Sequence, residues 1–185
     1  MSKKLRTLAV GAAATVTLAA ALPAAASEAD VTIVVRVDNR TSLPTDWLQE
    51  AKKEASQAYE AIGVSLVWLN SGNADPPSRR ARFDIVLLPS TRMAHVPRGA
   101  LGFAPHHTNR VYIFGDRIAK VAVSRRDFEV ILGRLFAHEL GHHLLPGQGH
   151  SNEGIMQKRV DFRSAKEVGF TDEQRDSIQG RLASN

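Results

Sequence analysis

The chain has 185 residues, of which 24 are basic and 19 acidic, and it contains no cysteine. This length allows one domain with a hydrophobic core and is too short for two domains of typical size. Because there is no cysteine, disulfides and thiolate metal sites are excluded, and any metal would be bound through nitrogen and oxygen.

The first 26 residues have the pattern of a cleaved export signal. Three basic residues precede an uncharged, alanine-rich run at residues 8–22, and small residues at 24–26 form a cleavage site. The apolar run is shorter than the roughly 20 residues that a membrane span needs, which disfavours the alternative of an uncleaved anchor. We expect cleavage near Ser27, one mature domain at residues 27–185, a secreted or periplasmic location, and no stable membrane association after cleavage.

The net charge does not indicate a polyanionic partner. Of the formal charge of +5, three positive charges leave with the signal, so the mature chain carries +2. The basic cluster of Arg79, Arg80 and Arg82 lies in a proline-containing loop, where solvated charges are the usual interpretation. The expected partner is a peptide or protein substrate, with no nucleic acid, and the expected oligomeric state is a monomer.

The first half of the mature chain contains three predicted strands and one predicted helix. The β-branched run at residues 31–37 predicts a strand. Residues 44–62 predict a helix, because apolar residues recur there at helical spacing up to Gly63. Two strands follow at residues 63–70 and 82–89, on either side of a loop rich in residues that break regular structure.

The second half contains the longest predicted helix. A short strand is predicted at residues 100–104, inside a long connection, and another strand at residues 110–114. Ser124 and Asp127 then form the capping signal of a long helix, which Pro146 ends.

A capping box of Thr171 and Gln174 begins the last predicted helix. The order of the preceding elements is strand, helix, strand, strand, short strand, strand and helix. This order predicts the α/β class, with one mostly parallel sheet and helices packed against it.

The segment AHELGHHLLPGQGHSNEGIM, residues 137–156, contains four of the seven histidines of the chain. His138 and His142 are four positions apart, so on a helix both rings lie on one face and can bind a single ion. Glu139 is offset by about 100° and could act as a general base towards water, whose pKa zinc lowers from about 15.7 to about 7. The alternative is that the histidines bind no metal and only cap the C-terminal end of the helix.

A catalytic zinc ion has three protein ligands and one open position, so a third ligand is needed. The sequence resembles the metzincin metallopeptidases, whose signature is H-E-x-x-H-x-x-G-x-x-H followed by a methionine turn. Gly147 to His150 match the G-x-x-H element two residues later than in the family, and Met156 matches the methionine turn. The resemblance implies one zinc ion bound by His138, His142 and His150, with Met156 beneath it.

Other groups remain open as the third ligand. His143 projects about 100° away from its neighbour His142, which disfavours it as a ligand to the same ion. The carboxylate alternatives are Glu153, Asp161 and Glu167. Surface or cleft-rim positions are expected for the three histidines of the long connection, His95, His106 and His107.

The resemblance also implies a fold. It predicts a five-stranded, mostly parallel sheet with an antiparallel edge strand, a backing helix and an active-site helix within residues 27–145. A smaller lower half, residues 146–185, would hold the methionine turn and a C-terminal helix. An edge strand beside the cleft can bind an extended peptide through main-chain hydrogen bonds. The residues in that edge position are Ala100, Leu101, Gly102, Phe103 and Ala104.

The sequence therefore predicts a secreted zinc-dependent endopeptidase with Glu139 as its general base. Two alternatives stay open: a metal-binding or interaction module without catalysis, and a zinc amidohydrolase with a carboxylate ligand. The only two tyrosines, Tyr59 and Tyr112, lie far from the motif in sequence, so the sequence indicates no oxyanion partner.

Overall fold

The computed structural model describes residues 31–70, 72, 81–89, 96, 99–158 and 168–184. The expected export signal and its cleavage site lie outside these residues. None of the helices in the described part of the chain is long and apolar enough to span a membrane.

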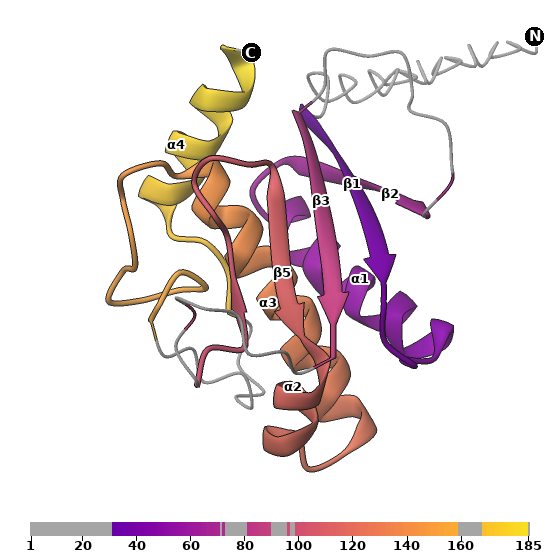
Figure 1. Cartoon of the computed structure of the whole chain (residues 1–185). Coiled ribbons are helices and arrows are strands. Elements are labelled where there is room, and N and C mark those ends of the chain that lie inside the picture. Colours follow the sequence, from indigo (N-terminus) through magenta and orange to yellow (C-terminus); the bar gives the residue numbers. More distant parts are fainter. Residues whose placement is uncertain are drawn as a thin grey trace, which may run out of the picture.

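A five-stranded sheet forms the centre of the described structure (Figure 1). Its strand order is β2-β1-β3-β5-β4, and only β4 runs antiparallel to its neighbour. This arrangement confirms the predicted mostly parallel sheet with an antiparallel edge strand. The strands are β1 (Val31–Asn39), β2 (Val64–Asn70), β3 (Ala81–Leu88), β4 (Gly102–Phe103) and β5 (Arg110–Phe114).

Two helices pack side by side against one face of the sheet, and two shorter ones lie near opposite ends of the strands (Figure 1). The pair on the face consists of α1 and α3, so the predicted backing helix and long helix share one layer. The helices are α1 (Thr45–Glu60), α2 (Gly115–Val121), α3 (Arg125–Leu144) and α4 (Asp172–Ala183).

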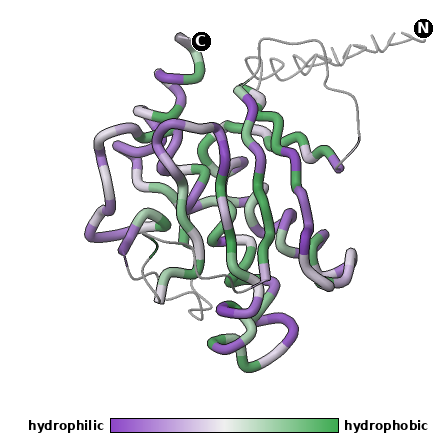
Figure 2. The backbone as a smooth tube through the Cα atoms, viewed as in Figure 1, coloured by the Kyte–Doolittle hydropathy of each residue, from purple (hydrophilic) through white to green (hydrophobic). Residues whose placement is uncertain are grey.

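The main hydrophobic core lies between the sheet and the helices α1 and α3. Every second residue of β1 contributes to it, and these side chains, Ile33, Val35 and Val37, are at most 5% exposed. This spacing follows from the strand geometry, in which successive side chains point to opposite faces. Figure 2 shows the hydrophobic residues gathered along the central strands and the helices behind them.

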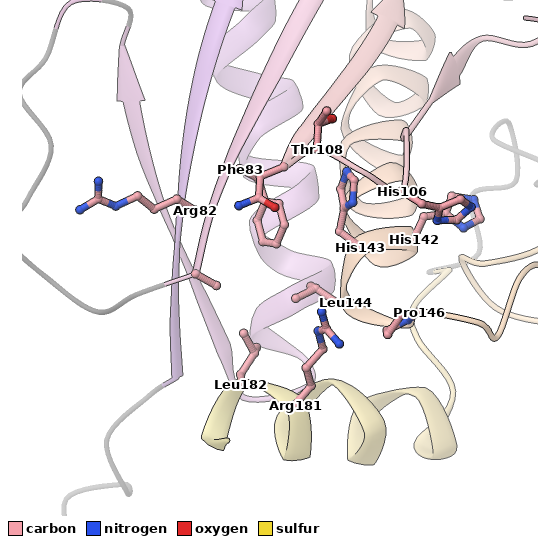
Figure 3. A pocket seen from close by; sticks show the side chains of 12 residues that line it. Arg82, Phe83, His106, Thr108, His142, His143, Leu144, Pro146, Arg181 and Leu182 are labelled. Atoms are coloured by element: carbon pink, nitrogen blue, oxygen red, sulfur yellow. The ribbon is translucent and has the colours of Figure 1, made fainter. Parts of the chain in front are cut away.

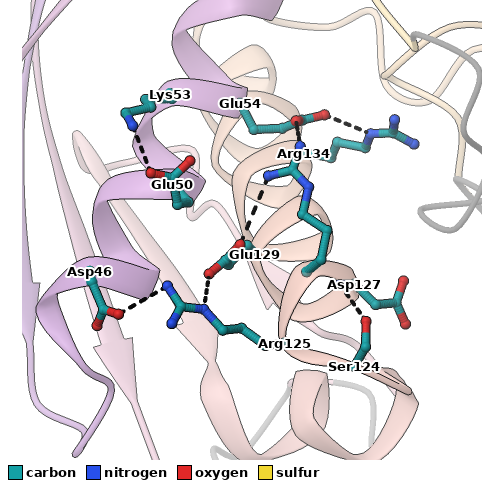
Figure 4. A network of polar contacts seen from close by, with 10 residues as sticks. Asp46, Glu50, Lys53, Glu54, Ser124, Arg125, Asp127, Glu129 and Arg134 are labelled. Atoms are coloured by element: carbon teal, nitrogen blue, oxygen red, sulfur yellow. Dashed lines mark hydrogen bonds and ion pairs between the residues drawn. The ribbon is translucent and has the colours of Figure 1, made fainter.

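A network of ion pairs joins α1 to α3 (Figure 4). The Nε atom of Arg134 donates to Glu54 at 3.2 Å, although the Arg134 side chain is only 7% exposed. Arg125 pairs with Glu129 at 2.6 Å and with Asp46 at 2.9 Å. These contacts fix how α3 lies against α1 over the turns that lead to the histidines.

The structure differs from the predicted elements in two places. The edge strand β4 contains only Gly102 and Phe103, whereas residues 100–104 were expected to form it. The helix α2 was not predicted, because seven residues are too few to show a clear helical period. The predicted caps of the two later helices are present: Ser124 accepts from Asp127 N at 3.0 Å, and Thr171 and Gln174 form a capping box.

Candidate metal centre

The helix α3 carries the HELGH segment in its last two turns and ends at Leu144. The chain then reverses through two glycines with left-handed backbones, Gly147 at φ 81° and Gly149 at φ 63°. Glycine adopts this conformation without the steric cost that other residues incur. The reversal brings His150 back beside the C-terminal end of the helix.

Three histidines converge at this point. The ligand nitrogens of His138, His142 and His150 lie within 4.8 Å of one another. The Nε2 atoms of His138 and His142 are 3.1 Å apart. In a tetrahedral zinc site with bonds of about 2.1 Å, two ligand nitrogens are about 3.4 Å apart. The helical pair therefore matches a zinc site closely, and His150 joins it from a loop.

The ring of His138 is held in the orientation that a metal ligand needs. Its Nδ1 atom lies 2.7 Å from the carbonyl oxygen of Ile155. A carbonyl only accepts hydrogen bonds, so Nδ1 carries the proton and Nε2 keeps its lone pair for an ion. Metal-binding histidines commonly donate their second ring nitrogen in this way.

The electrostatic surroundings favour neutral imidazoles, which is the form that binds metals. Burial lowers the pKa of His138. Burial, together with the charges of His138 and His150, lowers the pKa of His142 to about 3. Burial and the charge of Lys158 lower the pKa of His150. Protons therefore compete weakly with a metal for these three rings at neutral pH.

Glu139 lies beside the cluster and against the edge strand. Glu139 is only 5% exposed, and burial raises the pKa of its carboxyl group to about 8. A Cβ atom added at Gly102 would lie 2.9 Å from Glu139 Oε1, so β4 passes directly over this carboxyl group. A nearby cation would favour the ionised form that a general base requires.

Met156 lies beneath the helix turn that carries the histidines. It is fully buried, and a Cβ atom added at Gly141 would overlap its Sδ atom. The preceding Gly154 has φ 72°, and Ile155 N donates to Gly169 O at 2.8 Å. This tight turn brings the carbonyl group of Ile155 to His138.

The other histidines that the structure describes lie outside the cluster. His143 stacks on Phe83 with ring centroids 5.4 Å apart, and its Nε2 donates to Arg110 O at 3.1 Å. His106 and His107 are exposed on the connection between β4 and β5. Of the carboxylate candidates, Glu153 is exposed and is not part of the cluster. The remaining candidates, His95, Asp161 and Glu167, lie outside the described residues.

Neither tyrosine is placed to contact a reacting group. Tyr59 is fully buried, and its hydroxyl donates to Ala137 O at 3.1 Å, next to His138 in the helix. Tyr112 stacks on Phe103 with ring centroids 5.0 Å apart. Tyr59 therefore supports the helix that carries the histidines instead of facing a substrate.

The edge strand β4 pairs with β5 and lies close to Glu139. Leu101 O accepts from Phe114 N at 2.9 Å, and Ala100 O accepts from Arg117. β4 is last in the strand order, and no described strand pairs with its other side. Of the five predicted edge residues, Ala100, Leu101 and Ala104 flank the paired strand.

Two contacts of this centre were not predicted. The carbonyl of Ile155 orients His138, and the missing side chain of Gly102 makes room for Glu139. A carbonyl oxygen is common to every residue, so no side-chain pattern could have indicated it. The glycine was visible in the sequence, but nothing local indicates which distant group approaches it.

Comparison with known proteins reveals similar structures but no similar sequences. No family model matches this sequence, and no curated protein is similar to it. A zinc-dependent peptidase from Methanocorpusculum labreanum has a TM-score of 0.58 at 13% identity, covering 79% of this chain and 99% of that chain. Archaemetzincin from Methanopyrus kandleri has a TM-score of 0.57 at 12% identity, covering 83% of this chain and 96% of that chain. The chain thus shares its fold with these proteins.

Proposed function

We propose that this protein is an exported, zinc-dependent endopeptidase of the metzincin type. In this proposal His138, His142 and His150 bind a single zinc ion, and Glu139 acts as the general base. The observation that carries it is the convergence of three imidazole nitrogens within 4.8 Å, next to a buried glutamate, in a fold shared with a zinc-dependent peptidase.

The residues of the centre have separate tasks. Zinc would supply Lewis acidity, which polarises a peptide carbonyl and activates water at neutral pH. Glu139 takes a proton from the attacking water and passes it to the leaving amine. The carbonyl of Ile155 keeps His138 in the correct tautomer, because it holds the proton on Nδ1, 2.7 Å away.

The edge strand offers a way to hold the substrate. Gly102 and Phe103 pair with β5 on one side, and an extended peptide would pair with their other side by main-chain hydrogen bonds. Such pairing would hold the scissile carbonyl between β4 and the histidines. Because main-chain hydrogen bonds are independent of side-chain identity, this arrangement favours an endopeptidase that accepts unfolded protein segments.

The decisive experiment uses the mature protein from residue 27 and measures metal content and proteolysis together. We expect about one zinc ion per chain, cleavage of an unfolded protein such as casein, and loss of cleavage with a chelator. The Glu139→Gln variant should keep its zinc and lose about 10²- to 10⁴-fold in kcat, which is the usual contribution of a general base.

Glu153→Gln is the matched control, because Glu153 is an exposed glutamate in the loop after His150. It should retain both zinc and activity. Full activity of Glu139→Gln would remove the assignment of the base. Zinc binding without cleavage in the unmodified protein would instead support a metal-binding module that performs no hydrolysis.

A further inference from the structure

The edge strand β4 turns the main chain of one residue towards its open side. In an antiparallel pair, residues alternate between those whose main-chain groups face the partner strand and those whose groups face away. Leu101 faces β5, because its carbonyl oxygen accepts a hydrogen bond from Phe114 N at 2.9 Å. The next residue, Gly102, therefore directs its N–H and carbonyl groups to the opposite side, where no described strand pairs with it.

The two ends of this edge strand have different surroundings. Beyond its C-terminal end, the connection to β5 leads to a pocket of about 500 Å³ (Figure 3). His106 and Thr108 of this connection line the pocket together with His142 of the proposed metal centre. The segment before β4 instead contacts α2, where Ala100 O accepts a hydrogen bond from Arg117. A peptide that lies along β4 would thus run between α2 and the pocket beside His142.

Arg117 extends the pairing of the edge strand beyond the end of β5. Its guanidinium group donates to Ala100 O, next to the hydrogen bond between Leu101 and Phe114. β5 ends at Phe114 and α2 begins at Gly115, so β5 supplies no further backbone donor there. The side chain of Arg117 supplies a donor in its place.

The guanidinium group of Arg117 is itself held against the core. Its Cζ atom lies 4.1 Å from the centroid of the Phe114 ring, where a cation is attracted to the face of the aromatic system. Phe114 is fully buried, and its ring also stacks on Phe103 with centroids 6.3 Å apart. Ile118, the next residue of α2, is fully buried as well. Both anchors belong to the packed interior, so Arg117 ties the edge strand to a fixed part of the molecule.

A strand as short as β4 needs such an attachment. It aligns with only two residues of β5, Ile113 and Tyr112. Segments with few ladder hydrogen bonds open locally at a low free-energy cost. If β4 opened, the outward main-chain groups of Gly102 would lose their orientation, and a peptide would have to order them as it binds. That ordering weakens binding, because its cost is subtracted from the binding free energy.

We infer that Arg117 is a substrate-positioning residue, which holds Ala100 O at α2 and so keeps the main-chain groups of Gly102 directed towards an extended peptide. The ligand class is the main chain of a peptide, irrespective of its side chains. This inference rests on the proposed peptidase function and adds a residue to its substrate site. Arg117 is not part of the histidine cluster, so it acts through β4 and not on the reacting groups.

The first test separates substrate binding from chemistry. Arg117→Met removes the guanidinium donors and keeps an unbranched side chain beside Phe114. With unfolded casein as the substrate, we expect KM to rise about two- to tenfold, the range of one net hydrogen bond, while kcat and zinc content stay nearly constant. Arg117→Lys retains a cationic donor and should recover part of the loss.

Lys120→Met is the matched control, because Lys120 is an exposed cation on the same helix. It should leave KM unchanged. An unchanged KM in Arg117→Met overturns the inference. A loss of zinc and kcat together, without a change in KM, also overturns it, since that result would mean that Arg117 only supports the fold.

A binding measurement distinguishes failure of this inference from failure of the proposed function. A fluorescein-labelled casein peptide is titrated into zinc-loaded Glu139→Gln protein, with and without Arg117→Met, and followed by fluorescence anisotropy. A Kd that is about two- to tenfold higher without the guanidinium group supports the inference even if no peptide is cleaved. Equal Kd values overturn it and leave the peptidase in place if the unmodified protein cleaves casein.

Methylation of the peptide backbone tests for main-chain pairing directly. Each peptide of a series carries one N-methyl group, which removes one main-chain donor. At one position this methylation should weaken binding when Arg117 is present and weaken it less in Arg117→Met, because the edge strand is then no longer held for pairing. Strictly additive effects of methylation and substitution would show that Arg117 acts independently of this pairing, and the inference would be wrong.

Discussion

His150 joins the two helical histidines because the backbone before it turns through glycine. Gly147 and Gly149 have positive φ values of 81° and 63°, yet a Cβ atom at either position would meet nothing within 4 Å. Backbone conformation, and not crowding, therefore makes glycine favourable at these two positions. This reversal begins after α3 ends at Leu144, so His150 reaches the two helical histidines from a loop.

We expect His150→Ala to weaken zinc binding by more than about 100-fold, because losing an outer-shell partner alone costs about 10- to 100-fold. Competition with a chromogenic chelator measures this affinity. His143→Ala is the control, since the His143 ring contacts Phe83 and Arg110 and not the cluster. Equal zinc affinity in the two variants would mean that His150 is not the third ligand.

Gly141, inside the HELGH segment, illustrates how packing can reverse a helix preference. Alanine is about 1 kcal/mol more favourable than glycine inside a helix. At Gly141, however, an added Cβ would overlap Met156 Sδ and lie 3.3 Å from Phe170. We expect Gly141→Ala to lower the free energy of unfolding by about 1–3 kcal/mol and to weaken zinc binding. Urea unfolding and zinc titration measure these two effects.

The control for this substitution is Gly180→Ala in α4, where an added Cβ would meet nothing within 4 Å. It should raise the free energy of unfolding by up to about 1 kcal/mol. If Gly141→Ala were stabilising in the same way, contact with Met156 would not be the reason for the glycine.

At the scale of elements, α3 is buried on almost every side. Its neighbours are the sheet, α1 and the turn that contains Met156, and its N-terminal half lies very close to α1 at Gly133. A Cβ atom there would lie 2.5 Å from Ala51 O and 2.5 Å from Glu54 Cβ. The close approach also brings Glu54 to Arg134, 3.2 Å away.

Gly133→Ala should therefore force α1 and α3 apart. We expect the free energy of unfolding to fall by about 1–3 kcal/mol or more, because the obstructing atoms include backbone that cannot rotate away. Thermal and urea unfolding measure this loss. Zinc affinity per folded molecule should change less than in Gly141→Ala, because Gly133 lies more than one helical turn before His138. A stability equal to that of the unmodified protein would contradict the close packing of the two helices.

At the scale of the whole molecule, the proposed ion connects two parts of the chain. His138 and His142 belong to α3, whereas His150 belongs to the loop that leads towards Met156 and α4. A ligand that binds only the folded state stabilises it, by about 2.7 kcal/mol at a concentration 100 times its Kd. The metal should therefore act as a crosslink as well as a cofactor.

Metal removal tests this expectation. We predict that a chelator lowers the Tm of the unmodified protein, and that added zinc restores it. His150→Ala should show a much smaller change in Tm on either treatment. Differential scanning fluorimetry measures these shifts, and a Tm that is independent of zinc in the unmodified protein would argue against metal binding in the folded state.

Much of the secondary structure could be predicted because its signals are local. Ser124 and Asp127, and Thr171 and Gln174, are three positions apart and form the caps that their spacing predicts. The parallel sheet with its antiparallel edge is also confirmed, because the order of elements restricts the topology. α2 and the true length of β4 were missed, since short elements carry little periodicity.

The sequence by itself determined the α/β class, the ends of the long helices, and the pair of histidines on one helical face. Each of these depends on hydrogen bonds or side-chain spacing within a few residues. Only the tertiary structure decided that Ile155 O meets His138, that Gly102 passes over Glu139, and that His150 returns to the two helical histidines. These groups are far apart in the chain, and only the packing of the sheet, helices and loops brings them together.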